Sequence, residues 1–146
     1  GFMFNNAMSG FEPEPGFPNS IAPGKSRSTA IAQTVVKNKG KTELVLGSPG
    51  GSHITAGLAQ VLVNYLHFGC DLQDAVCRPR FDAWQNTLLL ESRMPYPLAN
   101  TLKNKWEIKR SPSPFGMVGR IYAVAFENGK AKPGYDPGEP ATVREV

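Results

Sequence analysis

Hydrophobic positions between residues 44 and 66 change from a strand pattern to a helix pattern across a glycine-rich turn. The apolar run at residues 44–46 ends at Gly47, which is typical of a strand with both faces covered. After the turn, apolar residues recur at helical spacing: Ile54, Leu58, Val61, Leu62, Tyr65 and Leu66. We therefore expect a buried strand, a turn, and a long helix that starts near Ser52 and is closed by Gly69.

The other apolar patterns predict short strands mixed with short helices. Residues 34–37 are expected to form a hairpin with residues 44–46, and Asp71 is expected to cap a helix over residues 72–78 that Pro79 ends. The remaining predicted elements are strands at 88–90, 106–109 and 121–126, and a helix at 95–105 with Pro97 in its first turn. Residues 121–126 are apolar on both faces, so this strand should lie between layers of an α+β domain.

Both ends of the chain give weaker patterns. Residues 1–33 are expected to be loop-rich after an opening strand at residues 2–6, because three prolines and a glycine lie within residues 12–18. The tail from Lys132 contains several glycines and prolines and is expected to be irregular.

The turn at residues 47–52 has the sequence GSPGGS. Adjacent glycines at the head of a helix allow consecutive backbone N–H groups to converge on an anion or an oxyanion. Two readings stay open from the turn alone. One is such a site, and the other is a tight strand-to-helix connection with Ser48 or Ser52 as the N-cap. The spacing fits neither a phosphate-binding loop nor a dinucleotide fingerprint.

Composition and charge exclude several classes of function. The 146 residues suit one domain over residues 1–146, and the net charge of +4 is spread along the chain, so a nucleic-acid partner is not expected. No apolar run is long enough to span a membrane. His53 and His67 lack metal-ligand spacing, so no metal or other cofactor is predicted. Cys70 and Cys77 are expected to be separate buried thiols rather than a disulfide.

Several ordered motifs together resemble the small subunit of gamma-glutamyltransferases. They are FMFNN at 2–6, PNSIAPGK at 18–25, GSPGGS at 47–52, PRF at 79–81 and SPFG at 113–116. The resemblance implies an N-terminal-nucleophile hydrolase with a four-layer αββα sandwich, self-cleaved from a precursor, with a large subunit as partner. It gives Gly50 and Gly51 the oxyanion hole and leans towards a periplasmic or secreted location. The threonine that attacks the gamma-amide is not found in this chain, and a threonine-bearing segment of the precursor is expected to supply it.

The residues expected to bind the substrate depart from the family pattern. Where the family carries a Ser-Ser pair for the alpha-carboxylate, this chain has Thr29 and Ala30. Where the family carries Gln and Asp for the alpha-amino group, this chain has Ala7 and Gly10. An ammonium group without a carboxylate partner loses charge-assisted hydrogen bonds, so we expect a changed acyl specificity, as in an acylase acting on a related small amide.

Two alternatives remain open at the level of sequence. The missing threonine and the departures at residues 7, 10 and 30 also fit a non-catalytic fragment or degenerate paralogue that serves as a binding or structural module. The family further includes depolymerases of poly-gamma-glutamate, whose polyanionic substrate would suit Lys25, Arg27 and Arg80. For Arg80 a buried ion pair that holds its loop is the alternative to substrate binding.

Overall fold

A computed structural model gives the structure of the chain, and it describes residues 1–138 and 141. The chain divides into two compact units, Gly1–Ala30 and Ile31–Val146, each with its own internal packing. The prediction of one domain over residues 1–146 stays a prediction. Within the described residues, none of the helices has both the length and the apolar character that a membrane span requires.

The first unit is mostly irregular. Its one helix is a short 3-10 turn, η1 (Ala7–Gly10), and its one bridge joins Glu12 to Ser20. The expected opening strand at residues 2–6 was wrong, since these residues form no strand and pair with none of the described residues. Phe2, Met3 and Phe4 are more than four-fifths exposed there.

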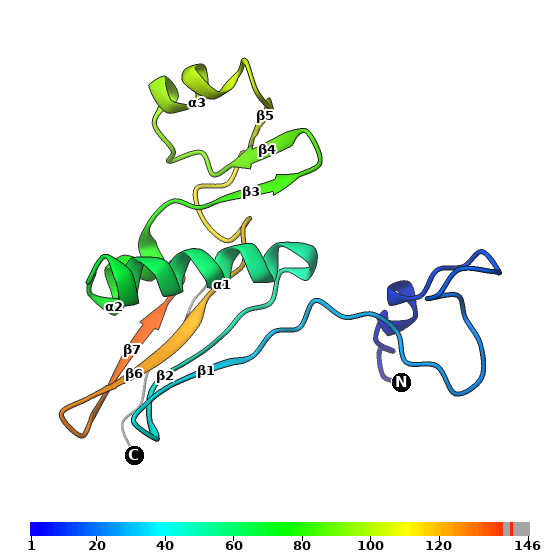
Figure 1. Cartoon of the computed structure of the whole chain (residues 1–146), viewed down its shortest axis with the longest axis horizontal. Coiled ribbons are helices and arrows are strands. Elements are labelled where there is room, and N and C mark those ends of the chain that lie inside the picture. Colours follow the sequence, from blue (N-terminus) through cyan, green and yellow to red (C-terminus); the bar gives the residue numbers. More distant parts are fainter. Residues whose placement is uncertain (139–140, 142–146) are drawn as a thin grey trace. The chain divides into compact units, whose positions relative to one another are not determined.

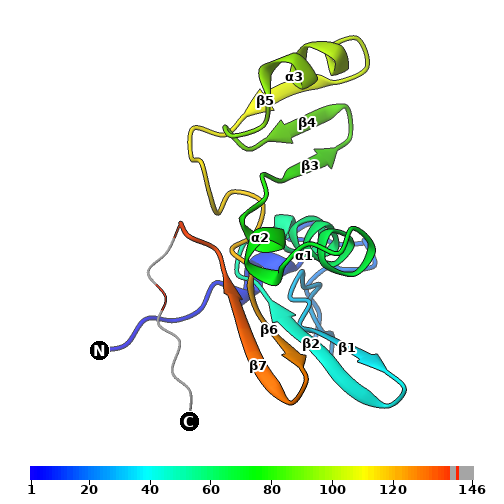
Figure 2. The same ribbon diagram turned by 90° about the vertical axis from the view of Figure 1, so that its left-hand side faces the viewer.

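The second unit is built on a four-stranded antiparallel sheet with the order β1-β2-β6-β7 (Figures 1 and 2). Its strands are β1 (Thr34–Asn38), β2 (Lys41–Gly47), β6 (Tyr122–Glu127) and β7 (Lys130–Tyr135). The predicted hairpin is confirmed, and its turn uses Lys39 and Gly40 at positive φ. The strand predicted at residues 121–126 is confirmed with a shift of one residue.

The expected irregular tail was wrong for residues 132–135, because they belong to β7. Proline and glycine suggested a break, but β7 is an edge strand, where Pro133 loses no bond that the sheet requires. The rest of that predicted tail, residues 139–140 and 142–146, lies outside the described residues.

A helical layer covers one face of this sheet (Figure 2). It consists of η2 (Gly51–His53), α1 (Ile54–Leu62), η3 (Val63–His67) and α2 (Leu72–Cys77). The core between the layers is formed by side chains that alternate along the strands and recur along the helices: Leu44, Leu46, Ile54, Leu58, Val61, Leu72, Ala75, Val76, Ile121, Ala123 and Ala125. The predicted long helix is therefore confirmed, although its last turn widens to a π-helix.

Capping is confirmed at the second helix and differs at the first. The Asp71 side chain accepts a hydrogen bond from the Gln73 N–H at 2.9 Å. By contrast, no side chain caps η2 or α1, so the reading of the turn in which Ser48 or Ser52 is the N-cap was wrong. Cys70 and Cys77 are free thiols, half-buried rather than buried.

The opposite face of the sheet carries apolar side chains that the described residues of the second unit leave partly exposed. Val35 pairs with Val45, and Val45 pairs with Val124, so these valines point to the same side. On that side Val35 is 54%, Tyr122 38% and Phe126 45% exposed. A sheet with one covered and one bare apolar face is half of a layered sandwich.

A smaller three-stranded sheet is inserted between α2 and β6. Its elements are β3 (Phe81–Trp84), β4 (Thr87–Leu90), α3 (Tyr96–Leu102) and β5 (Glu107–Arg110), with the strand order β3-β4-β5. A separate apolar cluster of Leu88, Leu90 and Ala99 holds α3 against it. Strand β3 was not predicted, and α3 is shorter than the expected helix at 95–105.

Candidate active site

The glycine turn joins the end of β2 to the start of η2 and has backbone angles that require glycine. Gly50 has a φ of 139° and a ψ of 9°, and Gly51 has a φ of 60°. Residues with a side chain larger than hydrogen rarely adopt these backbone angles. The GlyGly pair is therefore needed for the path of the chain at this point.

The carbonyl groups of the two glycines are used in the first helical turn, whereas their amides are not. The Gly50 carbonyl accepts from the His53 N–H at 3.2 Å, and the Gly51 carbonyl accepts from the Ile54 N–H. Among the described residues, no acceptor takes a hydrogen bond from the N–H of Gly50 or Gly51. Both glycines are exposed, and they precede a helix whose dipole favours negative charge at this end.

A second segment supports the turn from behind. The Arg120 N–H donates to the Pro49 carbonyl at 3.2 Å, and a Cβ on Gly50 would lie 3.1 Å from the Cα of Gly119. A Cβ on Gly119 would lie 2.9 Å from Ser48 Oγ, and Gly119 itself has a φ of 71°. The turn and the segment at residues 118–120 are thus in backbone-to-backbone contact, which only glycine allows.

Arg80 fixes the supporting segment in place. Its guanidinium donates to the carbonyls of Val118 and Gly119, both at 2.9 Å, and forms an ion pair with Asp136 at 2.5 Å. The Arg80 side chain is completely buried. This confirms the structural reading of Arg80, and it leaves no surface through which Arg80 would contact a polyanionic substrate.

A histidine–carboxylate pair lies next to the turn. His53 Nδ1 and Asp82 Oδ2 are 2.5 Å apart, which joins η2 to β3. Gln60 adds to this joint, since its side-chain amide bonds to both the N–H and the carbonyl of Phe81. Sequence reasoning missed the pair, because 29 residues separate its members and no local spacing indicates it.

The expected substrate-binding residues lie in the first unit, and Gly10 is the most constrained of them. A Cβ on Gly10 would lie 2.6 Å from the Ser28 carbonyl oxygen, so a carboxylate side chain has no room at this position. The Gly10 carbonyl accepts from Asn19 Nδ2, Ser28 Oγ and the Ser28 N–H. Ala7 begins the same η1 turn.

Thr29 and Ala30 end the first unit, with Thr29 exposed and Ala30 half-buried. Gly50 and Gly51 belong to the second unit. Elsewhere in the first unit, Lys25 donates to the Pro18 carbonyl and Arg27 to the Ser28 carbonyl. No cluster of three or more potential metal ligands occurs within residues 1–138 and 141.

The family model for gamma-glutamyltranspeptidase matches residues 1–144. The chain belongs to this family. Among the curated relatives of this gamma-glutamyltranspeptidase-family chain, an acylase proenzyme from Pseudomonas sp. (strain SE83) is 35% identical over 127 residues. The capsule biosynthesis protein CapD proenzyme of Bacillus anthracis is 38% identical over 131 residues, and the glutathione hydrolase proenzyme of Escherichia coli is 36% identical over 91.

These matches cover 86%, 88% and 56% of the chain, but only 22%, 24% and 16% of the relatives' own lengths. The chain therefore spans less than a quarter of the curated relatives it matches. Among solved structures, the gamma-glutamyltranspeptidase of Pseudomonas nitroreducens aligns with a TM-score of 0.88 at 26% identity, covering all of this chain and 82% of that one. The α+β N-terminal-nucleophile hydrolase fold that the motifs implied is thereby confirmed.

Proposed function

We propose that this chain supplies the oxyanion hole and part of the substrate pocket of an enzyme that hydrolyses or transfers the acyl group of gamma-glutamyl or related amides. The observation that carries the proposal is the pair of exposed N–H groups at Gly50 and Gly51, which have no acceptor among the described residues. They stand at a helix N-terminus on a turn that buried contacts hold rigid. Donors fixed before the reaction are what stabilisation of a developing oxyanion requires.

The turn is suited to bind a negatively charged oxygen, such as the one that forms when a nucleophile attacks an amide carbonyl. A threonine hydroxyl, supplied by a part of the full-length protein outside residues 1–146, attacks the amide carbonyl carbon and its proton passes to a base. The carbonyl oxygen becomes negative and accepts from Gly50 and Gly51, each contributing about 3 kcal/mol in the transition state. Collapse expels the amine with a proton and leaves an acyl-threonine ester. Water or a second amine then attacks the ester and releases the threonine.

The first unit supports a changed acyl specificity. Gly10 stands where the family carries the carboxylate for the substrate's alpha-amino group, and the contact with the Ser28 carbonyl excludes a side chain there. Ala7 and Ala30 likewise lack the polar groups of the family pattern. Acyl groups without a free amino group, such as glutaryl, lose nothing from these changes. The similarity to a protein named as an acylase supports the same direction.

The bare face of the main sheet supports a partner from the same precursor. Val35, Val45, Tyr122 and Phe126 expose apolar surface that a second sheet would bury in a four-layer sandwich. The curated relatives are named as proenzymes and are several times longer than this chain. We infer that the missing layers and the threonine come from the rest of the full-length protein.

The test uses the full-length protein and two anilide substrates. We expect specificity constants for gamma-glutamyl and glutaryl 4-nitroanilide that lie within about tenfold of each other, since the amino group has no carboxylate partner. A preference of more than about a hundredfold for the gamma-glutamyl anilide would contradict the specificity claim. Intact mass analysis tests the competing non-catalytic module, because the enzyme should contain a cleaved chain that begins with threonine.

The oxyanion role is tested by removing one donor. Replacing Gly51 with glycolic acid turns its N–H into an ester oxygen and leaves the backbone free to keep a φ of 60°, so it should lower kcat about 10²–10³-fold with little change in KM. Gly51→Ala keeps the N–H, and a Cβ there meets no atom within 4 Å, so it measures the cost of the positive φ alone. Equal losses of kcat in the two variants would refute the role of the Gly51 amide.

A further inference from the structure

A cavity of about 680 Å³ lies between the helical layer and the start of the small sheet. Its apolar wall is formed by side chains of η3, the α2–β3 connection and the small sheet: Val63, Phe68, Pro79, Phe81 and Met94. Val63 is 48%, Phe68 64% and Phe81 43% exposed. So much uncovered apolar surface around one hollow is typical of a docking site.

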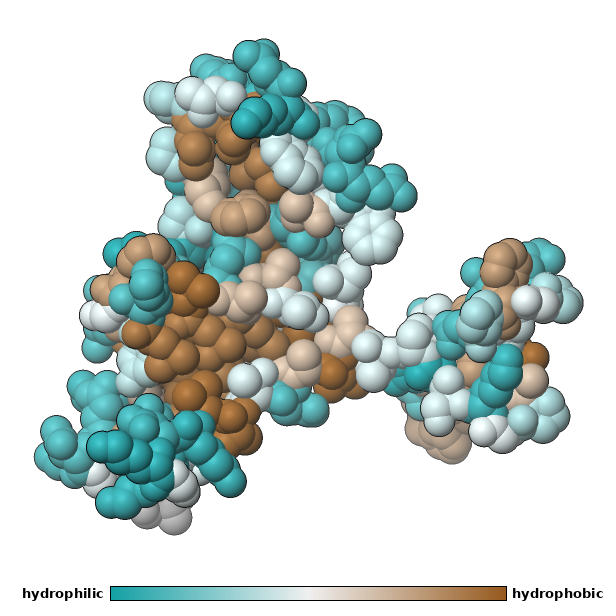
Figure 3. Space-filling view, viewed as in Figure 1, coloured by the Kyte–Doolittle hydropathy of each residue, from teal (hydrophilic) through white to brown (hydrophobic). Residues whose placement is uncertain are grey.

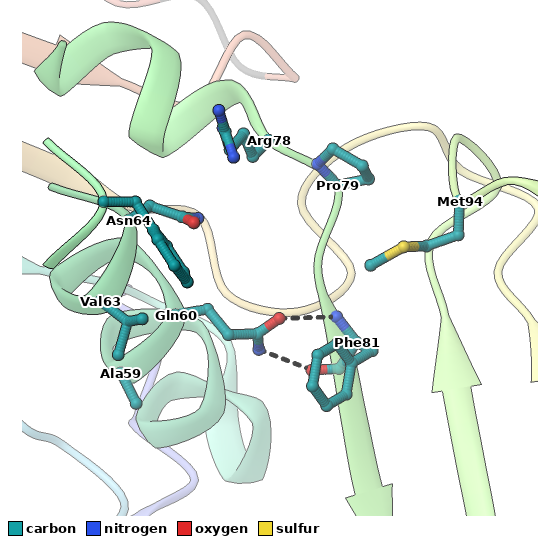
Figure 4. Close-up of a pocket in the computed structure, with 9 residues that line it drawn as sticks. Ala59, Gln60, Val63, Asn64, Arg78, Pro79, Phe81 and Met94 are labelled. Atoms are coloured by element: carbon teal, nitrogen blue, oxygen red, sulfur yellow. Dashed lines mark hydrogen bonds between the residues drawn. The ribbon is translucent and has the colours of Figure 1, made fainter. Parts of the chain in front are cut away.

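The polar groups at the cavity are few and differ in whether they are used. Gln60 is fully engaged, because its amide bonds to the Phe81 backbone, as Figure 4 shows. By contrast, neither the Arg78 guanidinium nor the Asn64 side-chain amide has a hydrogen-bond or ion-pair partner among the described residues. In Figure 4 both lie across the cavity from Phe81 and Met94. An apolar hollow with one free cation at its rim selects an apolar group next to an anion.

The helix changes its geometry at the cavity. Residues Val63–His67 form a π-helix, in which the Phe68 N–H donates to the Val63 carbonyl at 3.1 Å and the Cys70 N–H to the Asn64 carbonyl at 3.0 Å. Local π-helical turns are rare and are frequently found at functional sites. Val63, Asn64 and Phe68, which the π-turn positions, all line the cavity.

We propose that this cavity is the docking site of a segment of the full-length protein outside residues 1–146, in which an aliphatic or aromatic side chain lies next to an Asp or Glu. The apolar side chain fills the hollow between Phe68 and Met94, and the carboxylate pairs with Arg78 and accepts from Asn64. The docking proposal rests on the proposed function in one respect, because both assume that the full-length protein is longer than residues 1–146. That assumption has support, since a 35% identical relative is covered over 22% of its length, which leaves most of such a protein to pack against this chain.

The experiment places a photoreactive benzoylphenylalanine at position 68 of the full-length protein. We expect cross-links to one peptide outside residues 1–146 that contains an acidic residue within a few positions of an apolar one. Charge reversal by Arg78→Glu should reduce the yield of this cross-link at least about tenfold. Lys103→Glu makes the same change of charge at an exposed position away from the cavity and should leave the yield unchanged. Cross-links only within residues 1–146, or a yield insensitive to Arg78→Glu, would overturn the proposal.

A second arm separates a protein segment from a small ligand. Phenylacetate, which combines an aromatic ring with a carboxylate, should not bind to the intact protein, because the cavity is already filled. Saturable phenylacetate binding that Arg78→Glu abolishes would identify an open small-molecule site and overturn the docking proposal. Turnover of the anilides in the same preparation keeps the two proposals apart. Activity without the cross-link refutes only the docking site, and the cross-link without activity refutes only the proposed function.

Discussion

The glycine turn and the first thirty residues have different proposed roles, and different forces hold them. The turn is fixed by close backbone contact with Gly119 and by a completely buried Arg80 behind it. The first unit is fixed mainly by polar bonds that converge on the Gly10 carbonyl, while Phe2, Met3 and Phe4 stay exposed. Packing therefore holds the glycine turn, and hydrogen bonds within a loop hold the first unit.

The difference assigns separate tasks to the two regions. Oxyanion stabilisation depends on donors that do not reorganise during the reaction, and dense packing supplies that rigidity. Recognition of the acyl group depends on which side chains a loop presents, and loops tolerate change at such positions. Members of one family can therefore keep the turn and alter the acyl group that they accept. Perturbing each region should separate these properties.

The largest expected effect comes from Arg80, which supports the turn. Arg80→Met leaves Asp136 and Glu91, both completely buried, without the cation that pairs with them, and should lower the free energy of unfolding by about 3–5 kcal/mol. Urea unfolding of the full-length protein measures this loss. The double variant Arg80→Met/Asp136→Asn also removes the closer carboxylate, while Glu91 keeps its ion pair with Arg93 at 3.3 Å, so it should lose clearly less than the single variant. If Arg80→Met costs no more than Lys105→Met on the surface, packing does not hold the turn.

Gly57 lies in the interior of α1, and its replacement by alanine is expected to destabilise the protein, the opposite of the usual effect. Replacing an interior helical glycine with alanine ordinarily stabilises by about 0.5–1 kcal/mol. Here the new Cβ would lie 2.5 Å from the Val118 carbonyl oxygen, so Gly57→Ala should cost about 1–3 kcal/mol. Because residues 118–120 support Gly50, kcat should fall as well.

Thr55→Ala is the matched control for Gly57→Ala, since it adds alanine to the same helix at an exposed position. It should leave both stability and kcat nearly unchanged. A stabilised Gly57→Ala variant with normal kcat would show that the contact between α1 and residues 118–120 is looser than the structure has it.

Sequence patterns predicted the parts of the fold that depend on local chemistry. The strand, turn and helix at residues 44–66 follow from periodicity, and the cap at Asp71 follows from its side chain. The missed strands depend on partners: β3 pairs with β4, and β7 contains Pro133, which only its place at the sheet edge permits.

The same limit applies to the candidate site. Glycine spacing located the turn at Gly50 and Gly51, but not what supports it. Arg80 reaches the supporting segment and Asp136 38 to 56 residues further along the chain, and His53 meets Asp82 29 residues away. No local window contains such pairs. Conversely, the predicted opening strand was wrong because a strand needs a neighbour, which residues 2–6 lack in the described part of the chain.

A smaller, local effect is expected in the first unit. Asn19→Ala removes the bonds from Asn19 Nδ2 to the Gly10 carbonyl at 2.8 Å and to Ser28 Oγ at 3.2 Å. The loop should lose about 1 kcal/mol of local stability, mainly from the half-buried bond to Gly10, while global unfolding changes little. Hydrogen exchange at the Ser28 N–H, which donates to Gly10, measures the change. Lys25→Ala, which removes one exposed bond to the Pro18 carbonyl, should affect this exchange less.

The smallest effect is expected at the surface, where neither packing nor a closed loop contributes. A hydrogen bond from Lys132, followed by one from Tyr65, lowers the pKa of Glu127 below its ordinary value of 4.5. Burial, and then the bond to Glu127, raise the pKa of Tyr65 to about 12. Ionised Glu127 therefore stabilises the folded state above its unfolded-state pKa, and this stabilisation is lost as the pH falls through its folded-state pKa. The Tyr65 contribution is present below its ordinary pKa of 10.0 and lost as the pH rises through about 12.

Comparison of wild type with Glu127→Gln in urea, from pH 3 to 7, isolates this contribution. The difference in unfolding midpoint should be present at pH 6 to 7 and shrink as the pH falls below about 4.5, because protonation converts the carboxylate to a neutral group. Lys132→Gln should reduce the same difference, since it removes the main cause of the lowered pKa. A midpoint difference that stays constant with pH would mean that the Glu127 side chain acts through its shape, which would make the surface resemble the packed turn rather than contrast with it.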